Sequence, residues 1–152
     1  MQQIVRTTYL WHIIPICVGF GVLCGLRQLT RIDRLMQPVT SDPWGALVFV
    51  LSAGFALALP IGYRLVFVHR YRHRFHVPSR TFIRFEKNLV HIVMGAPYAA
   101  LAGYGLGIGT FHFAGSLLMA IYAVYYYYPS EKRLAAESRL FRVTPLSKAG
   151  LR

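Results

Sequence analysis

Acidic residues are scarce in this sequence, which has 152 residues and five Asp and Glu against seventeen Lys and Arg. None of the five acids lies inside a long apolar run, and no Lys or Arg lies in the middle of one. Proton relays and most ion-coupled carriers place such charges within the membrane. We therefore do not expect a transporter or pump that acts alone.

The sequence also lacks the short motifs of common enzymes. It contains no Gly-x-Ser-x-Gly, no phosphate-binding loop and no Cys-x-x-Cys. Its two cysteines, Cys17 and Cys24, would lie about 10.5 Å apart along a helix axis, beyond the reach of a disulfide. We interpret both as small packing residues, and we predict no catalytic activity and no metal site.

Apolar residues, in contrast, are abundant: 55% of the chain is hydrophobic, and 14% is charged. Four runs are each close to the roughly 20 residues that cross a hydrocarbon core. The sequence thus predicts an all-α integral membrane protein with four transmembrane helices and a basic inner loop at 69–88. The predicted spans are 9–26, 46–68, 89–106 and 111–128, within a membrane domain of residues 1–129.

The distribution of basic residues supports four spans over three. Only Gly107, Ile108 and Gly109 separate the third and fourth runs, so we expect a tight helical hairpin there. Four spans place fourteen of the seventeen Lys and Arg on one side, which the positive-inside rule makes the inner side. Three spans divide them eight against nine and predict no orientation.

The ends of the chain are both expected on this inner side. No secretory cleavage site follows the first run, so we expect it to remain as a membrane anchor. After Pro129, Ser130 is placed to cap a short amphipathic helix from about Glu131 to Val143, within a basic tail at 130–152. The predicted location is a bacterial or mitochondrial inner membrane.

The inner loop has the composition of a surface that binds acidic groups. Anionic lipid attracts each nearby Lys or Arg by roughly 1 kcal/mol. We predict that the loop binds lipid, cardiolipin being one candidate, or an acidic protein; no nucleic-acid recognition fold remains outside the spans. The predicted lipid- or partner-binding residues are Arg70, Arg72, Arg74, Arg80, Arg84 and Lys87.

Small residues form two stripes at helical spacing. Such stripes allow helix backbones to approach closely in lipid. Both packing within the bundle and docking onto helices of another protein are consistent with the pattern. The predicted packing residues are Gly21 and Gly25 in the first span, and Gly95, Ala99, Gly103 and Gly107 along the third.

Histidines are the residues able to carry redox or metal chemistry. His12 and His91 fall at matching depth on two spans, as axial ligation of haem b requires. This is similar to the small membrane anchors of succinate dehydrogenase, although their characteristic His, Arg and Asp spacings are absent. Histidines hydrogen-bonded to neighbours or lipid headgroups are the alternative. His69, His73 and His76 share one helical face, but adjacent arginines oppose a cation there.

Two functions follow as expectations. The first is a non-catalytic accessory subunit of a larger membrane complex, similar in composition to subunits of respiratory or photosynthetic assemblies, whose partners are other transmembrane subunits and anionic lipid. The alternative is a haem b-binding anchor of an oxidoreductase that uses His12 and His91. A free-standing lipid-binding or scaffolding protein is a third possibility.

Overall fold

The computed structural model describes residues 2–30, 43–72 and 77–140, and its elements are all helices. The prediction of an all-α protein is confirmed over these ranges. The elements are α1 (Gln2–Thr30), α2 (Pro43–Ala53), the π-helical turn η2 (Gly54–Ala58), α3 (Leu59–Tyr71), α4 (Ser79–Leu106), α5 (Thr110–Tyr126) and α6 (Glu131–Leu140).

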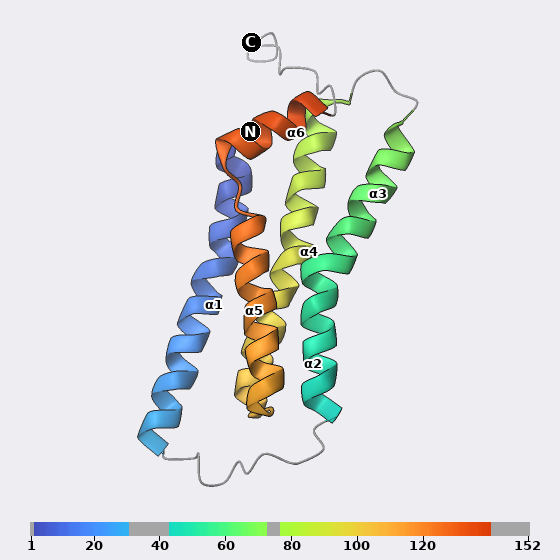
Figure 1. Cartoon of the computed structure of the whole chain (residues 1–152). Coiled ribbons are helices and arrows are strands. Elements are labelled where there is room, and N and C mark those ends of the chain that lie inside the picture. The colour runs from blue at the N-terminus through green and yellow to red at the C-terminus, as the bar shows by residue number, and fades with distance from the viewer. Residues whose placement is uncertain (1, 31–42, 73–76, 141–152) are drawn as a thin grey trace.

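Helix α4 is the centre of the bundle. It contacts α1, α2, η2, α3 and α5. Helices α1 and α4 run in one direction and α2, α3 and α5 in the other, while α6 lies across one end (Figure 1). We call this end, where α1 and α4 begin and α3 stops, the capped end.

Within the described residues, three helical segments are long and apolar enough to cross a membrane: Gln3–Leu29, Pro43–Tyr71 and Ser79–Leu106. Each extends beyond the apolar run predicted for it. Helix α4 in particular begins at Ser79, so most of the predicted inner loop is helical. Helix α5 has 17 residues, or about 25 Å at 1.5 Å per residue, somewhat less than a hydrocarbon core of about 30 Å.

The second of these segments bends at its middle. Pro60 has no backbone N–H, and a proline ring inside a helix clashes with the carbonyl four residues earlier. The π-helical turn Gly54–Ala58 directly precedes this proline and accommodates the irregularity. Beyond it, α3 leans away from α4 toward the capped end (Figure 1).

The predicted hairpin between the third and fourth apolar runs is present. Helix α4 ends at Leu106 and α5 begins at Thr110. Gly107 adopts the left-handed conformation with φ of 68°, which favours glycine, and its N–H donates to the carbonyls of Gly103 and Tyr104. Gly107 therefore terminates a helix as well as extending the stripe of small residues.

Polar side chains join the helices within the apolar core. Ser52 Oγ donates to the carbonyls of Ser116, at 3.1 Å, and Ala96, at 3.3 Å, linking α2 to α5 and α4. Tyr9 Oη donates to the carbonyl of Val124 at 2.7 Å, linking α1 to α5. Hydrogen bonds of this kind stabilise helix association in lipid, where the hydrophobic effect between helices is absent.

Candidate functional site

One face of α4 is left open between α1 on one flank and α3 on the other. It carries an exposed stripe of polar side chains at helical spacing: Arg84, Asn88, His91 and Tyr98. We call these four residues the open face. Polar groups at membrane depth are costly when they face lipid, so such a face is expected to be covered or to have a function.

Two predicted residues meet on this face. His12 Nε2 and His91 Nδ1 are 2.7 Å apart, a hydrogen-bonding distance, and the two rings stand almost perpendicular at 87°. His12 Nδ1 also lies 3.4 Å from the Tyr98 hydroxyl. Each histidine lies about three turns from the start of its helix. The structure therefore brings the two together at matching depth, as partners of each other.

This geometry does not fit an iron between the two rings as they stand. Two nitrogens on opposite sides of one metal ion lie roughly 4 Å apart, twice a metal–nitrogen bond of about 2 Å. The observed 2.7 Å is a direct contact. Axial ligation of haem would require α1 and α4 to separate and both rings to turn.

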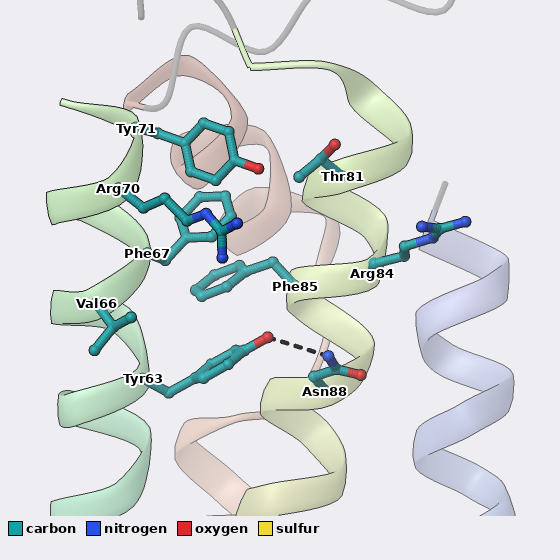
Figure 2. A pocket seen from close by; sticks show the side chains of 9 residues that line it. All are labelled: Tyr63, Val66, Phe67, Arg70, Tyr71, Thr81, Arg84, Phe85 and Asn88. Atoms are coloured by element: carbon teal, nitrogen blue, oxygen red, sulfur yellow. Dashed lines mark hydrogen bonds between the residues drawn. The ribbon is translucent and has the colours of Figure 1, made fainter. Parts of the chain in front are cut away.

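A pocket of about 180 Å³ opens between α3 and α4 near the capped end (Figure 2). The Phe85 ring stacks against Tyr63 with centroids 5.2 Å apart, and against Phe67 at 4.1 Å. Asn88 Nδ2 donates to Tyr63 Oη at 3.1 Å. The pocket exists because α3 leans outward after the π-helical turn, and aromatic side chains only partly fill the space.

The predicted lipid-binding residues are distributed around this pocket and beyond it. Arg70, on α3, and Arg84, on α4, line the pocket. Arg72 and Arg80 are exposed and Lys87 is half-buried. Arg74 lies outside the described residues, as do His73 and His76, whereas His69 is exposed on α3.

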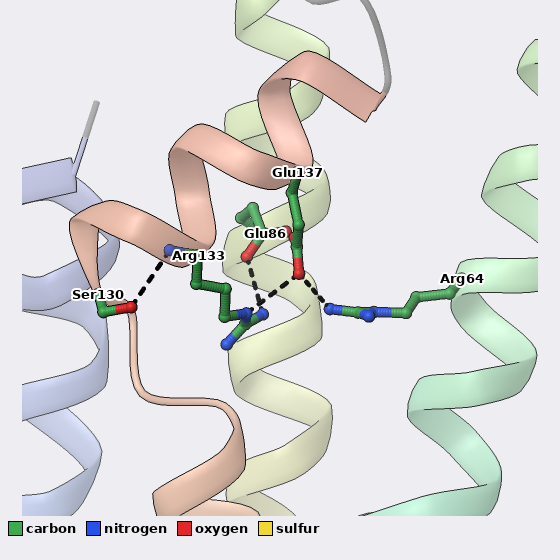
Figure 3. Close-up of polar contacts among 5 residues, drawn as sticks. All are labelled: Arg64, Glu86, Ser130, Arg133 and Glu137. Carbon is green, nitrogen blue, oxygen red and sulfur yellow. Dashed lines mark hydrogen bonds and ion pairs between the residues drawn. The ribbon is translucent and has the colours of Figure 1, made fainter.

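A cluster of four charged residues lies beneath α6 (Figure 3). Arg64 Nη2 of α3 donates to Glu137 Oε1 at 2.6 Å. Arg133 donates through Nε to the same oxygen at 3.0 Å, and through Nη2 to Glu86 Oε2 of α4 at 3.4 Å. We call these residues the charge cluster. It ties α6 to two helices of the bundle.

Burial makes this charge cluster more than a surface feature. Glu86, which the sequence placed in a loop, is 1% exposed inside α4. Burial raises the pKa of the Glu137 carboxyl. Its hydrogen bond with Glu86 lowers the pKa, and so do the positive charges of Arg133 and Arg64. Together these effects exceed that of burial, so the pKa of Glu137 lies below its ordinary value. Glu137 is therefore held as a carboxylate.

Helix α6 begins as the sequence predicts. The Arg133 N–H donates to Ser130 Oγ at 3.3 Å, an N-terminal cap. Arg133, which lies in the predicted basic tail, points into the charge cluster. Lys132 and Arg139 are exposed. An inward arginine is stabilised here because the Glu137 carboxylate and the Glu86 carboxyl group both accept hydrogen bonds from it.

The two stripes of small residues differ in their surroundings. A side chain at Gly95 would lie 2.5 Å from the Phe55 ring, and one at Gly103 would lie 2.9 Å from Val48, so these glycines allow close packing. Ala99 is half-buried beside them. Gly21 and Gly25 have open space at the same position. The first stripe therefore does not pack within the described chain.

The four residues of the charge cluster, together with Asn88 and Tyr98, were not singled out by sequence reasoning. One signal was available: Arg133 and Glu137 have the i, i+4 spacing of a helical ion pair. Among the described residues, no three His, Cys, Asp or Glu are placed to hold a metal ion. The chain matches no protein family model, no curated protein and no solved structure.

Proposed function

We propose that this chain is a non-catalytic accessory subunit of a larger membrane complex, which it joins through the part of the open face of α4 that carries His91 and Tyr98. The observation that carries this proposal is the exposure of His91 and Tyr98 at membrane depth, where a protein partner would satisfy them better than lipid. The unpacked Gly21 and Gly25 of the neighbouring helix are consistent with a partner helix at close range. An energy-transducing complex is proposed from composition alone.

The proposal predicts that the protein migrates with partners. After gentle solubilisation of native membranes, we expect it on a native gel in a band much larger than its own 17.3 kDa. The double variant His91→Leu with Tyr98→Phe should no longer migrate in that band, because it loses the polar contacts to the partner with little change in side-chain volume. Ile121→Ala, on the exposed surface of α5, is the matched control. A wild-type chain that migrates alone would contradict the proposal.

We also propose four spans, with α5 as the fourth and the capped end on the inner side of a bacterial or mitochondrial inner membrane. The support is the accumulation of fourteen of seventeen Lys and Arg on that side. The short α5 is completed by Tyr127 and Tyr128, since tyrosines favour the membrane interface.

Thiol labelling tests this topology. In a chain without Cys17 and Cys24, a membrane-impermeant reagent added from outside should label Thr110→Cys and not Glu131→Cys. Both positions are exposed, and α5 lies between them. Equal labelling of both would show that α5 does not cross the membrane. Labelling of Glu131→Cys alone would reverse the orientation.

The alternative function, a haem b anchor, has one observation in its support, that His12 and His91 meet across two helices, but their 2.7 Å contact would have to open for an iron to enter. If haem binds there, the reduced-minus-oxidised spectrum of the assembled sample shows a b-type band that is absent in His91→Ala. His112→Ala is the control, because that histidine begins α5 at the opposite end of the bundle. A fully assembled sample without such a band would remove this alternative.

A further inference from the structure

We infer that the pocket between α3 and α4 holds the phosphate of an anionic glycerophospholipid. The inference deepens the proposed function and rests on its placement of this end of the bundle at the inner membrane surface. Lipid binding was predicted for the whole basic loop at 69–88, whereas the pocket is a single site. Its lining comes from the last turns of α3 and the first turns of α4. The phosphate and glycerol would occupy the pocket, and the acyl chains would lie outside it.

The position of the pocket suits a headgroup. Three aromatic rings, from Tyr63, Phe67 and Phe85, form one wall, and arginines lie toward the capped end (Figure 2). Aromatic and basic residues favour the layer where hydrocarbon meets headgroups. Val66 forms the apolar side of the pocket and is 64% exposed, which provides a surface along which an acyl chain can lie.

The charge of the lining selects an anion. Arg70 extends toward the pocket from α3, whereas the Arg84 side chain, at the edge of the pocket on α4, extends toward α1 (Figure 2). Among the described residues, no acidic side chain lines the pocket. The nearest acids of these helices and of α6 do not compete, because Glu86 and Glu137 are bound to Arg133 and Arg64. The charge cluster thereby leaves the arginines of the pocket available to an external anion.

Hydroxyl groups complete the set of donors. Tyr71 and Thr81 point toward each other across the upper part of the pocket (Figure 2). Hydroxyls and guanidinium groups together are donors suited to the oxygens of a phosphate diester. A quaternary ammonium headgroup would also suit an aromatic wall, but the Arg70 guanidinium repels it. Phosphatidylglycerol and related lipids fit, whereas binding through the choline of phosphatidylcholine does not.

The test measures lipid binding by the full-length protein in nanodiscs. Discs of phosphatidylcholine with and without phosphatidylglycerol are compared, with inorganic phosphate and glycerol phosphate as soluble probes. Retained lipid is counted by native mass spectrometry after transfer to detergent. We expect phosphatidylglycerol to remain bound to the wild type, and the soluble probes to bind much more weakly because they lack acyl chains.

Two double variants with equal charge loss locate the site. Arg70→Gln with Arg84→Gln should weaken phosphatidylglycerol binding roughly 30-fold, as expected for two basic contacts to an anionic headgroup. Lys132→Gln with Arg139→Gln, exposed on α6 outside the pocket, should retain it. A third variant, Thr81→Phe, fills the pocket without altering charge and should also reduce binding. Thermal unfolding of each variant verifies that it is folded.

Each outcome decides the inference. Equal loss in both double variants would show general surface attraction and overturn it, as would glycerol phosphate binding as tightly as the lipid. The native gel separates this inference from the proposed function. A chain that joins its complex but binds no phosphatidylglycerol overturns the lipid site alone. Selective lipid binding by a chain that migrates alone supports the lipid site and overturns the accessory subunit.

Discussion

Arg133→Ala is expected to detach α6 from the bundle, lowering the free energy of its local opening by about 3 kcal/mol. The substitution removes the guanidinium that donates to both Glu137 and Glu86. It leaves two largely buried carboxyl groups with Arg64 as the remaining cation of the charge cluster. Hydrogen exchange in detergent measures the effect, and α6 amides should exchange about 100-fold faster while those of α4 change little.

Lys132→Ala is the matched control for this substitution. It removes one positive charge and a long side chain one position earlier, from an exposed site on the same helix. Exposed charges contribute little to stability, so α6 exchange should be almost unchanged. If the two variants exchange alike, the ion pairs do not hold α6. A double-mutant cycle with Glu137→Gln should be less than additive, because both residues belong to one network.

Glu137 gives the charge cluster one contribution to pH dependence, and the sign of that contribution follows from its lowered pKa. The pKa of Glu137 is lower in the folded protein than in the unfolded chain, for the reasons given above. Its stabilising contribution is therefore present at pH values above the ordinary carboxyl pKa, and is lost as the pH falls through the lowered value. Acidification below the ordinary carboxyl pKa should therefore accelerate α6 exchange in the wild type. Glu137→Gln should show a smaller acceleration over the same range.

Gly95→Leu is the second substitution with a large expected effect. A Cβ at this position would lie 2.5 Å from Phe55 Cδ1 and 2.6 Å from Cγ, so the ring itself would have to move. Phe55 packs against the core cluster that contains Leu89 and Val93, which limits that movement. Overpacking of this kind costs about 1–3 kcal/mol, measurable as a lower midpoint of thermal unfolding in detergent.

A matched substitution and a compensating one make the Gly95 prediction specific. Gly21→Leu introduces the same side chain where no atom lies within 4 Å, and it should leave the unfolding midpoint of the isolated protein unchanged or higher. Phe55→Ala should partly restore the stability of Gly95→Leu, because it removes the ring that obstructs the leucine. Equal destabilisation at positions 21 and 95 would mean that helix propensity, not packing, decides the outcome.

Sequence reasoning was most accurate where one local property controls the structure. The apolar runs indicate membrane helices because backbone groups in lipid must be satisfied within the segment. Gly107 marks the hairpin because a left-handed residue that ends a helix is most readily accommodated when it is glycine. Helix boundaries were less accurate: α4 begins ten residues before Leu89, since its first turns are stabilised by burial of Phe82 and Phe85.

The amino-acid composition and the lengths of the apolar runs are enough to predict a basic, all-helical chain whose apolar segments can cross a membrane. This prediction does not require knowing which face of each helix packs against its neighbours. Only the tertiary structure decided that His12 meets His91, that Arg133 turns inward to Glu86 and Glu137, and that Arg70 and Arg84 line one pocket. These residues come from different helices. Their meeting depends on how the helices rotate and lean, which is set by contacts such as Phe55 on Gly95 and by the bend before Pro60.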